Sequence, residues 1–264
     1  MQDQPKIIIV MNKTILLSIF ITFSISVIAQ NKPNIEWVTI PAGTFTMGSP
    51  EGEPERTEDE IQHQVTISSF EMSKFEITFA QYDQFCEATG RKKPYDEGWG
   101  RENRPVINIT WYDAKAFADW MGCRLPTEAE WEYACRAGTT TLFYTGECLT
   151  SKKANINGKD SFLNCAPGDS LGKTVPVGSY GPNPWGLYDM YGNVYEWCYD
   201  NYGKYTKASQ ENPTGPKKGD GRIMRGGCWM YDAYYCRSAY RNYDDPEAVY
   251  SSLGFRLVRD IKTQ

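Results

Sequence analysis

The chain has 264 residues, of which 41% are hydrophobic and 14% aromatic, and its formal net charge is -5. This composition can bury a substantial core and excludes an intrinsically disordered chain. Lys and Arg do not cluster into a basic stripe, so nucleic acid is excluded as a partner class. The sole histidine, His63, rules out a multi-histidine zinc or iron site, and we expect it to be a surface or capping group near a strand start.

The first thirty residues have the pattern of an export signal. Lys13 supplies a basic region, residues 15–28 form an apolar run, and residues 27–29 (VIA) offer a small-residue cleavage site. Met11 is an alternative start. A membrane anchor is the competing interpretation, since residues 7–29 are long enough to span a bilayer, but residues 12–14 (NKT) interrupt that run. We therefore predict a cleavable signal peptide over residues 1–29, a periplasmic, cell-surface or secreted location, and a single domain over residues 32–264.

Two short strands open the predicted domain. Residues 37–40 (WVTI) and 44–47 (TFTM) flank the turn-like residues 41–43 (PAG). The acidic stretch over residues 51–60 is expected to be a solvated loop, with a metal-binding role as the alternative.

Three helices are predicted next, each preceded by a threonine that can cap its first turn and followed by a terminating glycine. The expected N-caps are Thr78, Thr110 and Thr127, and the expected terminators are Gly90, Gly122 and Gly138.

Beyond residue 138 regular patterning fades. Gly, Pro, Asn and Tyr dominate residues 144–222, and short strands are expected only at 222–225 and 254–258. Loops this long inside a domain need tethers, for which disulfides and metal ions are the obvious candidates. Disulfides persist outside the cytosol, so some of the eight cysteines should be bridged.

The cysteines divide by their surroundings. A local bridge between Cys148 and Cys165 would brace one of the long loops. Cys86 and Cys123 lie on or just after apolar helical faces and are expected to be free thiols. For Cys198 and Cys228, buried thiols, a third bridge and a soft-metal pair all remain open.

Several segments together resemble the formylglycine-generating enzyme, or sulfatase-modifying factor, family. They occur in the family's order and cover nearly all of residues 36–260. The segments are 37–49 (WVTIPAGTFTMGS), 104–138 (RPVINITWYDAKAFADWMGCRLPTEAEWEYACRAG), 183–197 (NPWGLYDMYGNVYEW), 225–229 (RGGCW) and 254–259 (GFRLVR). The resemblance implies an α+β, elaborated C-type-lectin-like fold with little regular secondary structure and long loops. Fold alone does not settle function.

The resemblance also implies two structural calcium sites. Calcium takes about 6–8 oxygen ligands, so a mixture of carboxylates, amides and backbone carbonyls suits it. The first site would use the side chains of Asn155 and Asp169 and the carbonyls of Ile156 and Leu171. The second would use the carboxylates of Asp189 and Glu196 and the carbonyls of Gly192 and Val194. The alternative is that residues 191–193 (YGN) form only a tight turn beside exposed acids.

A second disulfide is implied by the family as well. Cys135 and, with a small shift, Cys236 match cysteines that the family joins as a structural bridge. Ala118 and Leu257 stand where the family's other bridge would be, so both of its partners are missing.

The family's oxidase chemistry is not expected here. Family oxidases act on a cysteine of a target sulfatase with a copper ion held by two cysteines, and two thiolates suit the soft ion Cu(I). The matching loop over residues 229–235 (WMYDAYY) contains no cysteine. Tyr231 stands at the first copper position and the second is missing. We therefore do not expect copper, and Cys198 with Cys228 is the one catalytic pair that we can suggest.

Aromatic and cationic side chains surround that loop instead. Trp229, Tyr231, Arg237 and Arg241 suit a peptide or glycan through stacking and bidentate hydrogen bonds, although they could equally build the core. Three functions follow: an exported, calcium-stabilised binding module for a protein, peptide or glycan; a divergent oxidase acting on a sulfatase; or an accessory subunit of a cell-surface secretion or motility machine.

Overall fold

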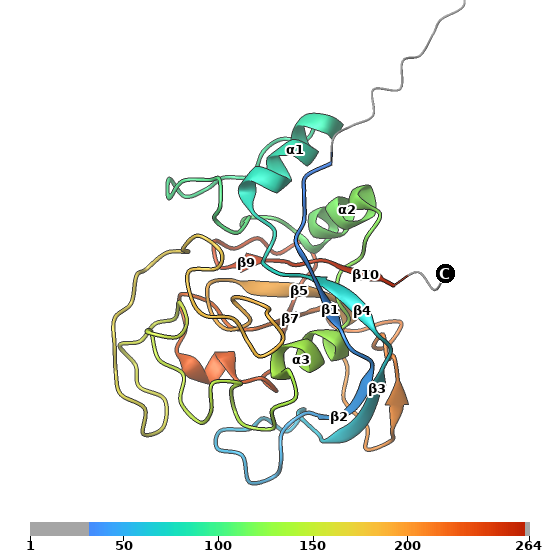
Figure 1. Ribbon diagram of the computed structural model, residues 1–264, viewed down its shortest axis with the longest axis vertical. Helices are drawn as coiled ribbons and strands as arrows, with labels where there is room; N and C mark the ends of the chain where they lie inside the picture. The colour runs from blue at the N-terminus through green and yellow to red at the C-terminus, as the bar shows by residue number, and fades with distance from the viewer. Residues whose placement is uncertain (1–31, 262–264) are drawn as a thin grey trace, which may run out of the picture. The chain divides into compact units, whose positions relative to one another are not determined.

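The computed structural model describes residues 32–261, so the predicted signal peptide lies outside the described residues. Within residues 32–261, no helix is long and apolar enough to cross a membrane. In this described part of the chain, three small sheets and three α-helices support long connecting loops (Figure 1). This is the α+β architecture expected, with little regular structure.

The strands fall into three sheets. The first has the order β1-β4-β10, from β1 (Trp37–Ile40), β4 (Phe70–Ser73) and β10 (Val258–Asp260). The second has the order β2-β3-β6, from β2 (Gly43–Met47), β3 (His63–Ile67) and β6 (Gln210–Glu211). The third has the order β8-β7-β5-β9, from β8 (Asn242–Asp244), β7 (Arg222–Arg225), β5 (Tyr195–Asn201) and β9 (Leu253–Gly254). A short 3-10 helix, η1 (Ala233–Cys236), precedes β8.

The helices begin where the capping residues predict. In α1 (Phe79–Thr89), α2 (Trp111–Met121) and α3 (Glu128–Arg136), the side chain of the preceding threonine accepts a hydrogen bond from the backbone N–H of the third helical residue. The side-chain oxygen of that residue accepts one from the threonine backbone N–H in return. Gly90 and Gly122 end the first two helices in the left-handed conformation. The third differs from the prediction, because Ala137 and not Gly138 takes the left-handed cap position.

Two other expectations are wrong in detail. The acidic stretch over residues 51–60 is not simply a solvated loop, because Glu60 is fully buried and Glu53 pairs with Arg237. The predicted strand at 254–258 is two separate short strands, β9 and β10.

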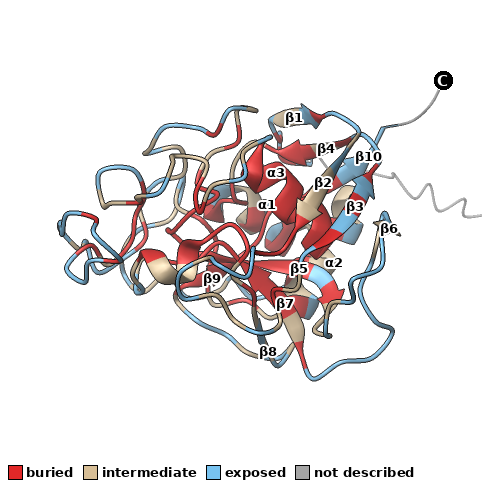
Figure 2. Ribbon diagram, turned by 90° about the horizontal axis from the view of Figure 1, so that it is seen from below, coloured by how far each residue is buried: buried red, intermediate tan, exposed pale blue. Residues whose placement is uncertain are grey.

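Helix α3 occupies the centre of the fold and carries charge into it. All nine of its residues are buried, including Glu128, Glu132 and Arg136. Glu132 pairs with Arg136 at 2.9 Å and with Arg225 of β7 at 2.5 Å. Figure 2 shows α3, β5 and β7 mostly in the colour of buried residues, while exposed residues concentrate in the loops. Removing one partner of such a pair would leave an uncompensated buried charge.

Candidate functional site

The residues of the first expected calcium site differ in burial. Asn155 and Ile156 are buried, and the Asn155 amide donates to the Lys173 carbonyl at 3.0 Å. Asp169 and Leu171 are exposed, Leu171 by 53%. The Asn155 Oδ1 atom is buried and has no hydrogen-bond partner among the described residues. A buried acceptor without a donor is costly, and a cation would relieve that cost.

The second expected site adjoins the first. Asn193 donates its backbone N–H to the Asn155 carbonyl at 2.8 Å, and Asn155 forms an isolated β-bridge with Gly192. A Cβ atom at residue 192 would overlap the Asn155 carbonyl, so the close approach of the two segments requires glycine there. The two calcium segments predicted from sequence therefore meet at this point.

The acids of the second site are buried and already have partners. Both Glu196 oxygens pair with the Arg256 guanidinium at 2.6 Å, and Trp131 Nε1 donates to one of them at 2.8 Å. Asp189 accepts the Gly178 N–H at 2.6 Å. Calcium bound here would have to share the Glu196 carboxylate with Arg256.

Sequence reasoning missed a third acid at this place. Glu76 is fully buried and accepts hydrogen bonds from the Asn193 amide at 2.7 Å and from the Val194 N–H at 3.3 Å. No motif marked Glu76, because it lies more than a hundred residues upstream of both partners. We call Glu76, Asp189 and Glu196 the acidic cluster.

The acidic cluster is short of positive charge. Burial, followed by repulsion from Asp189 and Glu196, raises the pKa of Glu76 well above its usual value. Burial likewise raises the pKa of Asp189 to about 6. Arg256 pairs with Glu196 alone among the three acids. Within residues 32–261, three or more Asp, Glu, His or Cys side chains nowhere converge as metal ligands. A calcium ion here would therefore depend on carbonyl and amide oxygens beside the acids, as the family pattern implies.

The cysteines only partly follow the sequence predictions. Cys148 and Cys165 form a disulfide with Cα atoms 5.5 Å apart. Cys86 and Cys123 are free thiols. Cys135 and Cys236 are also free, so the implied bridge between them is not formed.

Tyr191 lies beside the Cys135 thiol. The Cys135 thiol interacts with Tyr191, whose hydroxyl lies 2.7 Å from the hydroxyl of Ser238. The Tyr191 hydroxyl therefore lies between the Cys135 thiol and Ser238. The Cys236 sulfur instead packs where a side chain at Gly227 would stand, next to Cys228.

The suggested pair of Cys198 and Cys228 is not assembled. The two thiols belong to different hydrophobic clusters, and Cys198 Sγ faces the Glu196 carbonyl at 3.9 Å. Burial raises the pKa of Cys228 to about 11 and those of Cys198 and Cys236 well above the usual value. All three are therefore thiols and not thiolates at neutral pH.

The two arginines proposed for ligand binding have internal roles. Arg237 is fully buried and forms a bidentate pair with Glu60 at 2.7 and 2.9 Å. Arg241 forms a bidentate pair with Glu128 at 2.7 and 2.9 Å. Both guanidinium groups are therefore engaged in ion pairs inside the fold, which corrects the expectation that they face a ligand.

The two aromatic candidates remain near the surface. Tyr231 is 39% exposed, and Trp229 packs edge to face against Trp99 at 5.4 Å. Met230 and Tyr250 are exposed beside them. We call Trp99, Trp229, Met230, Tyr231 and Tyr250 the Trp229 surface. Exposed aromatic and methionine side chains of this kind are typical of protein and peptide contacts.

His63 differs from the surface or capping group that the sequence predicted. It opens β3, but it is buried and not a surface group: its Nδ1 lies 3.0 Å from the Ile61 carbonyl, and its ring packs against Tyr205 at 4.8 Å.

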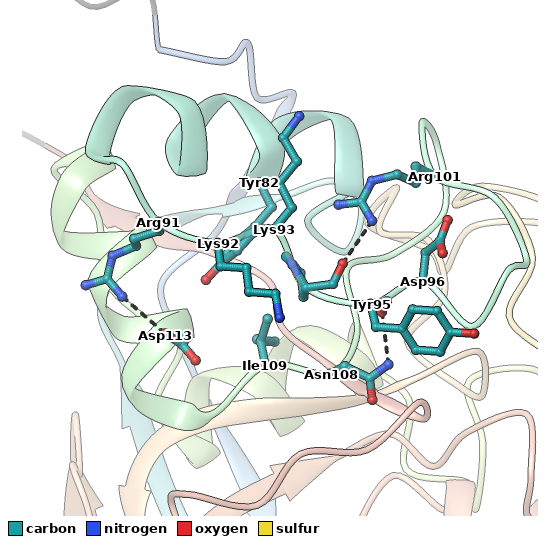
Figure 3. A pocket seen from close by; sticks show the side chains of 11 residues that line it. Tyr82, Arg91, Lys92, Lys93, Tyr95, Asp96, Arg101, Asn108, Ile109 and Asp113 are labelled. Carbon is teal, nitrogen blue, oxygen red and sulfur yellow. Dashed lines mark hydrogen bonds and ion pairs between the residues drawn. The ribbon is translucent and has the colours of Figure 1, made fainter.

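A cavity of about 720 Å³ lies between the end of α1 and the loop that leads to α2 (Figure 3). Two of its arginines have local acidic partners. Figure 3 shows Arg91 directed at Asp113, a pair at 3.2 Å, and Arg101 pairs with Asp83 at 2.5 Å. It contains none of the site residues predicted from sequence, and four cationic and two acidic side chains line it.

The geometry can be set beside known proteins. Residues 24–261 match the family described as the sulfatase-modifying factor enzyme 1-like domain. A formylglycine-generating enzyme from Mus musculus is 32% identical over 278 residues, covering 84% of this chain and 74% of the enzyme. The structure of PvdO from Pseudomonas aeruginosa superposes with a TM-score of 0.72 at 32% identity, covering 85% of this chain and 94% of that one.

Another relative is much longer than this chain. A protein named serine/threonine-protein kinase pkn1 from Chlamydia pneumoniae is 37% identical over 252 residues. The match covers 86% of this chain but only 38% of that protein.

Proposed function

Because this chain belongs to the sulfatase-modifying factor family, we propose that it is an exported, calcium-stabilised binding module of that family and not a formylglycine-generating oxidase. Its partner is an exported protein, a peptide or a glycan, with a sulfatase among the candidates. The export pattern of residues 1–29 supports the location.

The thiol arrangement is the observation that carries this proposal. The loop at the family's copper position, residues 229–235, has no cysteine. The thiols that flank it, Cys228 and Cys236, are fully buried and have raised pKa values. A Cu(I) centre needs two positioned thiolates that oxygen and substrate can reach. Tyr231 is no substitute, because a phenol is a harder ligand and its pKa is raised further by burial.

The acidic cluster and Asn155 support the calcium part of the proposal. The residues present fit a hard cation in three respects: the unpartnered Asn155 oxygen, the excess of buried carboxylates, and the absence of any soft ligand in the set. Calcium would supply positive charge at the point where residues 155 and 192 meet. Asp169 would add a carboxylate and Leu171 a backbone carbonyl from the exposed side of the site.

The Trp229 surface is where we expect the partner to bind. With Arg237 and Arg241 committed to internal pairs, stacking and apolar contact would provide most of the binding free energy there. This favours a peptide or protein segment with apolar side chains.

An anaerobic Cu(I) titration against a chromophoric chelator tests the proposal. We expect the folded protein to take less than one equivalent of copper, because its thiols are buried and not paired on an open face. Cys228→Ser and Cys236→Ser are the matched variants. A full equivalent of copper in the wild type that either variant loses would sink the proposal.

That result would favour the alternative function, a divergent oxidase, which the position of the Cys236 thiol also supports. The Cys236 sulfur packs beside Gly227, the residue before Cys228, so the two thiols could form a relocated pair if the loop between them opened.

A further inference from the structure

A groove lies beside α3 along β2 and β3, well separated in sequence from the Trp229 surface. Figure 1 shows these two strands and the loop between them next to α3. The groove has a volume of about 380 Å³. Three aromatic residues, Phe45, Tyr133 and Trp185, contribute to its wall. Hydroxyl and amide side chains also line it: Thr44, Thr46, Gln62, Gln64, Thr139 and Thr140.

The aromatic rings form a continuous wall. The centroids of Phe45 and Tyr133 are 5.1 Å apart, and those of Tyr133 and Trp185 are 4.9 Å apart. Phe45 and Trp185 are half-buried, so both keep part of their surface open to solvent. The Tyr133 hydroxyl sits where a side chain at Gly43 would stand, which holds its ring in place. Trp185 is anchored by its backbone N–H, which donates to Asn183 Oδ1 at 3.0 Å.

The groove has no free charge. Arg136 is the one charged residue that lines it. Its guanidinium donates to Glu132 at 2.9 Å and to the Gly48 carbonyl at 3.0 Å, so it is already satisfied. A charged ligand would lose its hydration here and gain no counter-ion.

The polar side chains can still form hydrogen bonds. Gln64 donates from Nε2 to Thr46 Oγ1 at 2.7 Å, which leaves its carbonyl oxygen able to accept. Gln62 and Gln64 are both exposed, two residues apart around the start of β3. Side-chain amides and hydroxyls both donate and accept, as the hydroxyl groups of a sugar do.

We infer that this groove binds a neutral glycan, with a pyranose ring stacked on Trp185 and its hydroxyl groups bound by Gln62 and Gln64. Apolar C–H faces and neutral hydroxyl groups are the ligand chemistry that an uncharged, aromatic-walled, amide-rich groove matches. The inference holds whether or not the domain is an oxidase, because none of these residues belongs to the cysteine loop.

The test is titration of the full chain with neutral hexasaccharides, namely cellohexaose, maltohexaose, mannohexaose and chitohexaose, followed by tryptophan fluorescence and calorimetry. Chondroitin sulfate and a blocked neutral hexapeptide are the competing probes. At least one neutral hexasaccharide should bind, and Trp185→Ala should weaken it about tenfold, the size of one aromatic stacking contact. Gln62→Ala with Gln64→Ala changes only exposed side chains, so it should weaken binding without unfolding the protein.

Tyr112→Ala is the matched control, because Tyr112 is an exposed aromatic residue on α2 that does not line the groove. It should leave binding unchanged. Three outcomes would overturn the inference: none of the four sugars binds; binding survives both groove variants; or the sulfated glycan or the peptide binds in their place.

Discussion

The disulfide between Cys148 and Cys165 should contribute a large share of the stability of the long loops. It closes a loop with a sequence separation of 17 residues, which carries Asn155 and Ile156. In the chain-entropy account, a loop of this length stabilises the folded state by about 3 kcal/mol. For a domain of this size that corresponds to a fall of about 6–12 °C in the melting temperature when the bridge is removed.

The perturbation is the double variant Cys148→Ser, Cys165→Ser, measured by scanning calorimetry at neutral pH. Cys123→Ser is the control, because Cys123 is a half-buried free thiol with no bridge to lose. The control should melt within about 1–2 °C of the wild type, as a change without a large packing effect does. A double variant that melts with the control, or a wild type whose Cys148 reacts with a thiol reagent before reduction, would refute this reasoning.

Three further predictions follow from the same contacts. Removing calcium with a chelator should lower the melting temperature, because an ion that binds only the folded state stabilises it by about 2–3 kcal/mol near saturation. An unchanged melting temperature would contradict the proposed calcium sites. Burial raises the pKa of Asp200 well above its usual value, so the folded state holds the proton more tightly and loses stability as pH rises above about 4. Asp200→Asn should therefore melt no lower than the wild type at pH 7.5, with the gap closing toward pH 4; a less stable variant at pH 7.5 would refute this. In non-reducing peptide mapping Cys135 and Cys236 should both be found as free thiols, and a peptide joining them would show that the sulfurs rearrange.

Local signals predicted the helices well. A threonine N-cap and its partner three residues later depend only on neighbouring backbone, so Thr78, Thr110 and Thr127 could be assigned without knowledge of the fold. The glycine terminators follow for the same reason. Ala137 is the exception, because a non-glycine residue took the left-handed position one residue early.

Long-range charge pairing could not be predicted in this way. Arg237 resembled a ligand-binding group in sequence, but it pairs with Glu60, which is 177 residues away. Glu60 in turn resembled part of a solvated acidic loop and is fully buried. Both residues were assigned wrongly because the sequence does not show that Arg237 and Glu60 are partners. Glu76 was missed for the same reason, since its contacts to Asn193 and Val194 cross more than a hundred residues.

The predictions of site residues also succeeded for local segments and failed for a long-range pairing. Asn155 and Gly192 were predicted to belong to two calcium segments, and the structure places those segments in contact. The bridge between Cys135 and Cys236 that the family resemblance implied is not formed, and both are buried free thiols. Sequence spacing alone cannot fix a disulfide pairing in a segment whose loop length differs from that of the family.

The most direct test of the central claim is mass spectrometry of a sulfatase-motif peptide incubated with the protein, copper, oxygen and a thiol reductant. The claim is that this chain keeps the family's fold and lacks its oxidase chemistry. The account predicts that the peptide's cysteine remains unconverted while the protein stays folded. Formylglycine in the peptide, formed by the wild type and abolished by Cys228→Ser or Cys236→Ser, would contradict it.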